Sequence, residues 1–189
     1  MRPQTNRGAA WLPLLLITLG LAGCPPVDPL TVDEVEPIGA LSGSFTCTID
    51  ASGEARFDLG PAALDGTLES TEFVAGLRTQ GCLARRLAAD RGDVVSVVLL
   101  QQTRFDRAQA LELNFPVDLL EAEDSELLID DVLAFAGNGG FGSMYVIDPG
   151  EEPNPIARTA GGGVLLGARG VDEGDVVSGS FTDLRMGAL

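Results

Sequence analysis

The chain contains no histidine and no lysine, and only one tryptophan and one tyrosine occur among its 189 residues. Without histidine, the Ser-His-Asp and Cys-His catalytic arrangements and imidazole metal sites are excluded. All 12 basic residues are arginines, against 28 acidic residues, which gives a formal net charge of −16. A nucleic-acid partner is therefore not expected, because phosphate binding needs a basic surface. The composition predicts a protein that is not an enzyme, with no catalytic residue and no cofactor.

The N-terminal residues have the pattern of an export signal. Arg2 and Arg7 precede an apolar run from Gly8 to Ala22, and small residues lead to Cys24. A positive start, a short apolar segment and small residues before a cut site describe such a signal. At about fifteen residues the run is shorter than the ~20 that a membrane-spanning helix needs.

The end of this segment, Leu21-Ala22-Gly23-Cys24, resembles the lipobox of bacterial lipoproteins. The resemblance implies cleavage between Gly23 and Cys24, with lipid (diacylglycerol and a further acyl chain, typically palmitate) attached at Cys24. It further implies an exported protein held by its lipid at the cell envelope. Pro25 rather than aspartate follows the cysteine, which by the same resemblance favours the outer membrane. An ordinary secretory signal, or an N-terminal anchor helix, is the alternative.

The remaining chain divides into a tether and a domain. Residues 24–39 are rich in proline and acids, which favours an extended acidic tether after the 1–23 signal peptide. Docking of part of this tether as an edge strand is the alternative. Residues 40–189 have the length of one globular domain. Removal of Arg2 and Arg7 with the signal changes the charge to 10 − 28 = −18.

Two of the three cysteines are predicted to form a disulfide. Lipid on Cys24 leaves Cys47 and Cys82, and an exported compartment permits the bond. Cys47 alternates with Thr46 and Thr48, so it shares an inward strand face with Phe45. Two separate buried thiols are the alternative.

The domain is expected to be mainly β: a single-domain antiparallel β-sandwich or barrel of about eight short strands, with one or two short helices. Short runs separated by Gly, Pro and Asp favour this architecture. It resembles in style the uncharacterised β-rich lipoproteins of bacterial envelopes. We expect a strand at 94–103 that is buried on both faces. The other expected strands are 43–50, 55–59 (paired with 43–50), 67–77, 110–115, 144–147, 163–168 and 176–184, the last two forming a terminal hairpin.

Two stretches have a helical composition. Residues 82–89 (CLARRLAA) predict two turns of helix. Residues 117–136 fit either one helix or several elements, and aspartates interrupt the apolar stripe of the single helix. We therefore expect a short helix at Val117–Glu121, then a loop, then a strand near Leu127–Phe135.

One hexapeptide recurs at the two ends of the domain. Leu41-Ser42-Gly43-Ser44-Phe45-Thr46 is echoed by Val177-Ser178-Gly179-Ser180-Phe181-Thr182. We expect the two strands to be neighbours that close a barrel or sandwich edge. Coincidence in a chain rich in Ser and Gly is the alternative.

Two further patterns are weaker. Gly137–Gly142 satisfies G-x-G-x-x-G, but an apparent strand follows it, whereas dinucleotide binding needs a helix there, so a hairpin loop is expected. Acidic clusters supply oxygen ligands for weak Ca²⁺ binding, although none has EF-hand spacing, and solvated turns are the ordinary interpretation. The clusters are Glu121/Glu123/Asp124/Glu126, Asp130/Asp131, Asp148/Glu151/Glu152 and Asp172/Glu173/Asp175.

These features together predict a lipid-anchored, non-enzymatic structural or interaction module that meets a protein partner of the envelope. A lipoprotein that binds a small apolar molecule or Ca²⁺ is the alternative. A hydrolase built on paired carboxylates is the third hypothesis, and no pair is selected by the sequence.

Overall fold

The computed structural model describes residues 37–50, 59–68, 71–73, 80–88, 92–102, 107–122, 126–129 and 139–189. Contacts divide the chain into two units, 1–32 and 33–189, and every described residue lies in the second. The predicted signal peptide, Gly23 and Cys24 therefore lie outside the described residues. Among the described residues, no helix is long and apolar enough to cross a membrane.

Strands dominate the described chain, and one short helix accompanies them. In order, the elements are β1 (Pro37–Thr48), β2 (Ala62–Leu68), β3 (Thr71–Phe73), β4 (Gln80–Leu87), β5 (Val94–Gln102), β6 (Ala108–Pro116), α1 (Val117–Glu121), β7 (Glu126–Leu128), β8 (Phe141–Ile147), β9 (Asn154–Gly161), β10 (Gly163–Arg169) and β11 (Val176–Gly187).

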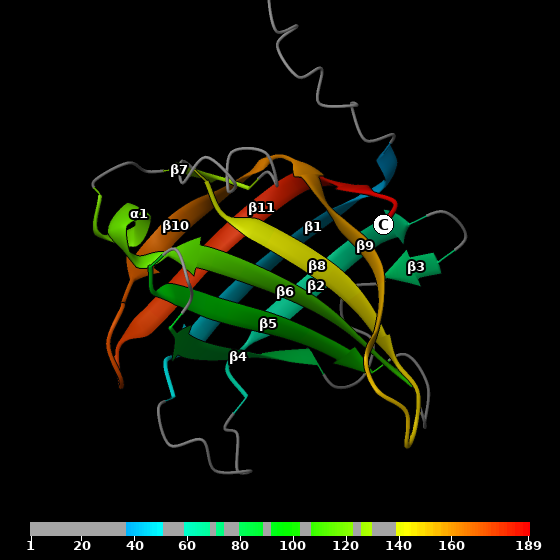
Figure 1. Cartoon of the computed structure of the whole chain (residues 1–189), viewed down its shortest axis with the longest axis horizontal. Coiled ribbons are helices and arrows are strands. Elements are labelled where there is room, and N and C mark those ends of the chain that lie inside the picture. Colours follow the sequence, from blue (N-terminus) through cyan, green and yellow to red (C-terminus); the bar gives the residue numbers. More distant parts are fainter. Residues whose placement is uncertain are drawn as a thin grey trace, which may run out of the picture. The chain divides into compact units, whose positions relative to one another are not determined.

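All of the strand pairs are antiparallel, in the order β3-β2-β1-β11-β9-β8-β6-β5-β4, with β10 pairing β11 and β7. Figure 1 shows the sheet folded into two layers, in which β4, β5, β6 and β8 cross over β1, β2, β10 and β11. We call these the second and the first layer. The expected mainly-β, antiparallel, sandwich-like fold is confirmed, with eleven described strands rather than about eight. The sheet is not a closed barrel, because β4 meets the first layer only through single bridges.

Alternating side chains of both layers fill the space between them. In β1, Leu41 and Phe45 are buried while Ser44 and Thr46 are exposed, which is the period-two pattern of a strand with one solvated face. The ring of Phe45 stacks on that of Phe115 from β6, with 6.1 Å between the ring centroids. Aromatic contacts at this spacing add to the burial energy, so this pair joins the two layers at their centre.

Most residues of the apolar strand β5 are buried. The first four residues, Val94 to Val97, are all buried. Along the rest of the strand, Val98, Leu100 and Gln102 are half-buried. The strand lies between β4 and β6, so its backbone is paired on both sides. The prediction of a strand buried on both faces therefore holds for its first half.

The predicted helix at 82–89 is wrong, since residues up to Leu87 form strand β4. Leu, Ala and Arg favour helices locally, which produced the expectation. In the fold, β4 pairs with the β-branched strand β5 along its whole length, and Cys82 and Ala84 point into the core. Tertiary pairing overrides the local preference here.

The region after β6 follows the sequence closely. The short helix at Val117–Glu121 is confirmed, and its Val117 and Leu120 are buried. A strand follows at Glu126–Leu128, shorter than the predicted 127–135, and residues 130–138 lie outside the described ones. The terminal hairpin of β10 and β11 is also confirmed.

One other expectation is corrected, one lies mostly outside the described residues, and one strand was not expected. Strand β1 begins at Pro37, so residues 37–39 belong to the domain and not to the tether. Its hairpin-side neighbour is β2, whose seven residues start at Ala62, and most of the predicted 55–59 strand lies outside the described residues. Strand β9 was not predicted, because Pro155 and the polar Asn154, Arg158 and Thr159 mask its alternation.

The two copies of the repeated hexapeptide lie side by side, as predicted. Strand β1 pairs with β11 so that Ser44 lies opposite Ser180, Phe45 opposite Gly179, and Gly43 opposite Phe181. The two strands occupy the middle of the strand order, however, so they do not close an edge.

Candidate functional site

The two cysteines that the sequence paired form a disulfide, which confirms that prediction. Cys47 of β1 and Cys82 of β4 are bonded, and both are 1% exposed. Beside this bond, the backbones of Gly60 and Cys82 exchange two hydrogen bonds of 2.9 and 3.0 Å. The disulfide therefore ties β4 to the first layer at an edge where the ladder is short, which is a structural role.

No described group of three or more Asp, Glu, His or Cys residues is arranged to hold a metal ion. The described members of the predicted acidic clusters lie in turns and at strand ends, as Asp148 and Asp172 do, except for Glu121, which ends helix α1. Asp148 pairs with Arg107 at 2.6 Å, and Asp172 with Arg86 at 2.7 Å. These carboxylates are thus engaged in exposed ion pairs. Glu123, Asp124, Asp130 and Asp131 lie outside the described residues.

The glycine-rich motif leads into a strand. Gly137 and Asn138 lie outside the described residues, and β8 begins at Phe141 within the motif itself. A dinucleotide fold would place a helix N-terminus there to meet the pyrophosphate. The strand removes the structural context that this motif requires.

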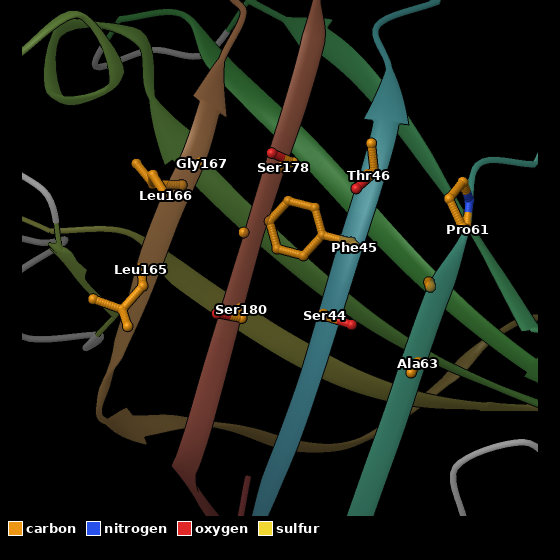
Figure 2. A pocket seen from close by; sticks show the side chains of 12 residues that line it. Ser44, Phe45, Thr46, Pro61, Ala63, Leu165, Leu166, Gly167, Ser178 and Ser180 are labelled. Atoms are coloured by element: carbon orange, nitrogen blue, oxygen red, sulfur yellow. The ribbon is translucent and has the colours of Figure 1, made fainter.

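The outer side of the first layer carries a shallow hollow of about 640 Å³. Four hydroxyl residues form its floor: Ser44 and Thr46 on β1, and Ser178 and Ser180 on β11. Figure 2 shows them on neighbouring strands, flanked by Ala63 of β2 with the preceding Pro61 and by Leu165, Leu166 and Gly167 of β10. We call this surface the hydroxyl face.

Register and side-chain size explain why the face is hollow. Ser44 lies opposite Ser180, and Thr46 opposite Ser178, so the hydroxyls form a two-by-two array. The serine and threonine side chains are short, so they project little from the sheet. Leu165, which is 56% exposed, projects further at one side of them. A Cβ on Gly167 would lie only 2.8 Å from the Ser178 Oγ, so glycine keeps this part of the face open.

The hydroxyls differ in their hydrogen bonds. The Ser178 Oγ accepts a hydrogen bond of 2.8 Å from the Ala168 backbone N–H, which holds the irregular β10–β11 pairing. The side chains of Ser44, Thr46 and Ser180 make no hydrogen bond to any other described residue. They are therefore available to a ligand as both donors and acceptors.

The hydroxyl face is also uncharged. None of the 12 residues that line it is acidic or basic, although the chain as a whole carries a formal charge of −16. Protein interfaces typically have a centre depleted of charge and a polar rim. This contrast distinguishes the face from the rest of an acidic surface.

A polar cluster lies on the outer side of the second layer. The Glu112 carboxylate accepts hydrogen bonds from the Ser96 Oγ at 2.9 Å and from the Tyr145 hydroxyl at 3.2 Å. Burial raises the pKa of Tyr145, and the negative charge of Glu112 raises it further. Because the tyrosine is held neutral and the carboxylate is fixed by two donors, this cluster stabilises the β5-β6-β8 surface.

A second hollow, of about 550 Å³, lies where β5 and β8 end and β6 begins. Its walls include the apolar side chains of Leu59, Leu100, Ile147 and Pro149. The Arg107–Asp148 ion pair is among its lining residues. Apolar walls with a few polar groups are typical of small-molecule sites, so this hollow is where an apolar ligand would fit.

The sequence identified the disulfide but not the hydroxyl face. The signal was present, since both hexapeptides place Ser and Thr on the polar side of a strand. The pairing of the strands and the contributions of β2 and β10 were needed to assemble the surface. Comparison of this chain with protein-family models, with curated proteins and with solved structures finds no match.

Proposed function

We propose that this protein is a lipid-anchored, non-enzymatic interaction module of the bacterial cell envelope. The hydroxyl face carries the proposal, because it offers an uncharged, hydrogen-bonding surface on a scaffold whose layers are joined by a core and a disulfide. The lipobox resemblance of residues 21–24 supports the anchoring half of the proposal. With a lipid at Cys24, the acidic tether would hold the domain away from anionic headgroups.

Site-specific photo-crosslinking tests the interaction half in cells that express the full chain. A benzophenone amino acid at the exposed Ser180 should give a discrete adduct with a second polypeptide. The same amino acid at Glu152, exposed in the turn after β8, is the matched control and should not give that adduct. Equal adducts from both positions, or none from Ser180 in a correctly folded variant, would show that the hydroxyl face is not an interaction surface.

Substitution of the predicted lipid site tests the anchoring half. Cys24→Ala should move the protein from the membrane fraction to the soluble fraction and leave the Cys47–Cys82 bond intact. Ser44→Ala, which alters the face without touching the anchor, should leave the distribution unchanged. A Cys24→Ala variant that remains in the membrane fraction would disprove lipid anchoring at this residue.

Binding of a small apolar molecule is a second candidate function, favoured by the hollow lined by Leu59 and Leu100. The neutral dye N-phenyl-1-naphthylamine should then gain fluorescence saturably with the purified domain. Leu59→Asp should abolish the gain, because Leu59 is 44% exposed and its loss leaves the core intact. An unchanged titration with this variant would rule the hollow out as the binding site.

A further inference from the structure

Acidic residues surround the uncharged hydroxyl face. Glu126 of β7 lies opposite Leu165, at the end of the row that runs through Ser180 and Ser44. Asp65 of β2 lies opposite Ser42, and Asp183 lies at the β11 irregularity facing the same residue. All three acidic side chains are exposed. The rim of the face is therefore predominantly negative.

Negative charge also lies at the start of β11. Asp175 directly precedes Val176, which pairs with Thr48 beyond the hydroxyl array. Two arginines also lie near the rim. Arg169 donates to the Ala122 carbonyl, and Arg185 packs against Gly161. An uncharged centre inside a mainly acidic rim is the charge pattern that a partner must complement.

This pattern excludes several occupants. A second copy of the chain would bring one acidic rim against another, and like charges brought together across an interface repel each other. Nucleic acids and anionic lipid surfaces are repelled for the same reason. A small cationic ligand would gain nothing from the centre of the face, which carries no charge.

We propose that the hydroxyl face docks a protein that carries basic residues around an uncharged, hydrogen-bonding centre. This inference rests on the proposed interaction function and names the chemistry of its partner. The exposed hydroxyls of Ser44, Thr46 and Ser180 meet polar groups at the centre, and the acidic rim meets arginine or lysine side chains. Long-range attraction between the acidic domain and a basic partner speeds their encounter.

The size of the face determines the kind of complex. A stable interface uses roughly 20–30 residues a side, whereas 12 residues line this hollow. Interfaces smaller than the standard size belong mostly to transient complexes. The hollow alone is smaller than a stable interface, so a covalent trap, which also captures short-lived complexes, is the appropriate way to observe the partner.

The experiment measures the yield of the adduct formed from a photo-crosslinker at Ser180, in cells that express the full chain. In one variant Asp65→Asn and Glu126→Gln remove two rim charges. In the matched control, Asp118→Asn and Glu151→Gln remove two charges from exposed residues of α1 and the turn after β8. The rim variant should reduce the adduct by about threefold or more, since charge steering falls with each complementary charge removed, and the control should not.

The outcomes distinguish two claims: that the partner is basic, and that the hydroxyl face is an interaction surface. A reduced yield with the rim variant, together with Lys or Arg residues beside the crosslinked position of the partner, supports the inference. An adduct of equal yield in both variants overturns the basic-partner inference but leaves the interaction function intact. An adduct of the chain with its own copy overturns it as well. The absence of any Ser180-specific adduct overturns both.

Discussion

Phe45 lies directly opposite Gly179, and its ring Cζ is 3.0 Å from the position that a Cβ on this glycine would occupy. The repeated hexapeptide produces the same pair in the other direction, with Phe181 opposite Gly43. In each pair the aromatic ring covers the space that the glycine leaves, a device that protects glycine in a strand. The rings lie on the inner side, and the serines between them form the centre of the hydroxyl face.

An alanine at Gly43 should destabilise the domain. Its Cβ would lie 2.6 Å from the Phe181 Cζ and 2.7 Å from the Ala63 carbonyl oxygen, which belongs to the backbone and cannot move alone. Overpacking of this kind costs about 1–3 kcal/mol, enough to lower the melting temperature by several degrees in a domain of this size. Thermal unfolding followed by circular dichroism measures the change.

Ser44→Ala is the matched control for this change. The residue is adjacent on the same strand, exposed, and its hydroxyl makes no hydrogen bond to another described residue. Its effect should stay within about 0.5 kcal/mol. Equal stability of the two variants would show that the glycine–phenylalanine pairing is not tightly packed.

The alternating segments were predictable because period two follows directly from strand geometry. Residues 43–48 and 110–115 show this: polar and apolar side chains alternate, and the structure has them in β1 and β6. Residues 82–87 were predicted to be helical because Leu, Ala and Arg favour helices. Pairing with β5 and the disulfide fix this segment as a strand. Local preference carries no information about a pairing partner.

The hydroxyl face required information that no single segment contains. Each hexapeptide predicts outward hydroxyls, but their array depends on the register in which Ser44 meets Ser180. Ala63 and Leu165 come from strands whose neighbours are set by the whole fold. The disulfide was accessible from the sequence because the assignment of Cys24 to lipid left only one pair.

Loss of the disulfide should destabilise the domain strongly. The bond closes a loop with a sequence separation of 35, which corresponds to about 4 kcal/mol in the chain-entropy model. The double variant Cys47→Ala, Cys82→Ala should therefore unfold at a much lower urea concentration, and wild type unfolded with a reductant should match it. The Cys24→Ala variant retains the bond and should behave as wild type. A urea midpoint that does not change with reductant would contradict the prediction.

Arg86 should stabilise the domain mainly at low salt. It donates to Asp93 at 3.0 Å and to Asp172 at 2.7 Å, and so joins β4 to the turn before β11. The hydrogen bond and charge of Asp93, together with Asp172, raise the pKa of Arg86, so this arginine stays charged at all ordinary pH values. Exposed pairs contribute little and are screened by salt.

Thermal melts at low and high salt test this contribution. Arg86→Gln should lower the melting temperature slightly at low salt, and the difference from wild type should shrink at about 1 M salt. Arg185→Gln, at an exposed arginine with no ion pair to a described residue, should show a smaller difference at either salt concentration. A difference for Arg86→Gln that persists unchanged at high salt would indicate packing rather than charge.

Tyr145 offers a direct optical measurement, because it is the only tyrosine in the chain. Burial, and then the charge of Glu112, raise its pKa above the ordinary 10.0. Absorbance of tyrosinate near ~295 nm should therefore titrate at a higher pH in the folded protein than in urea. Glu112→Gln removes the charge but not the burial, so it should lower the pKa towards 10.0 without reaching it.

A folded pKa above the unfolded one stabilises the native state fully below pH 10, and that contribution is lost as pH rises through the folded pKa. Urea unfolding at pH 8 and at pH 11 should show this loss for wild type and a smaller loss for Glu112→Gln; an equal loss in both would mean that Glu112 does not act on the tyrosine.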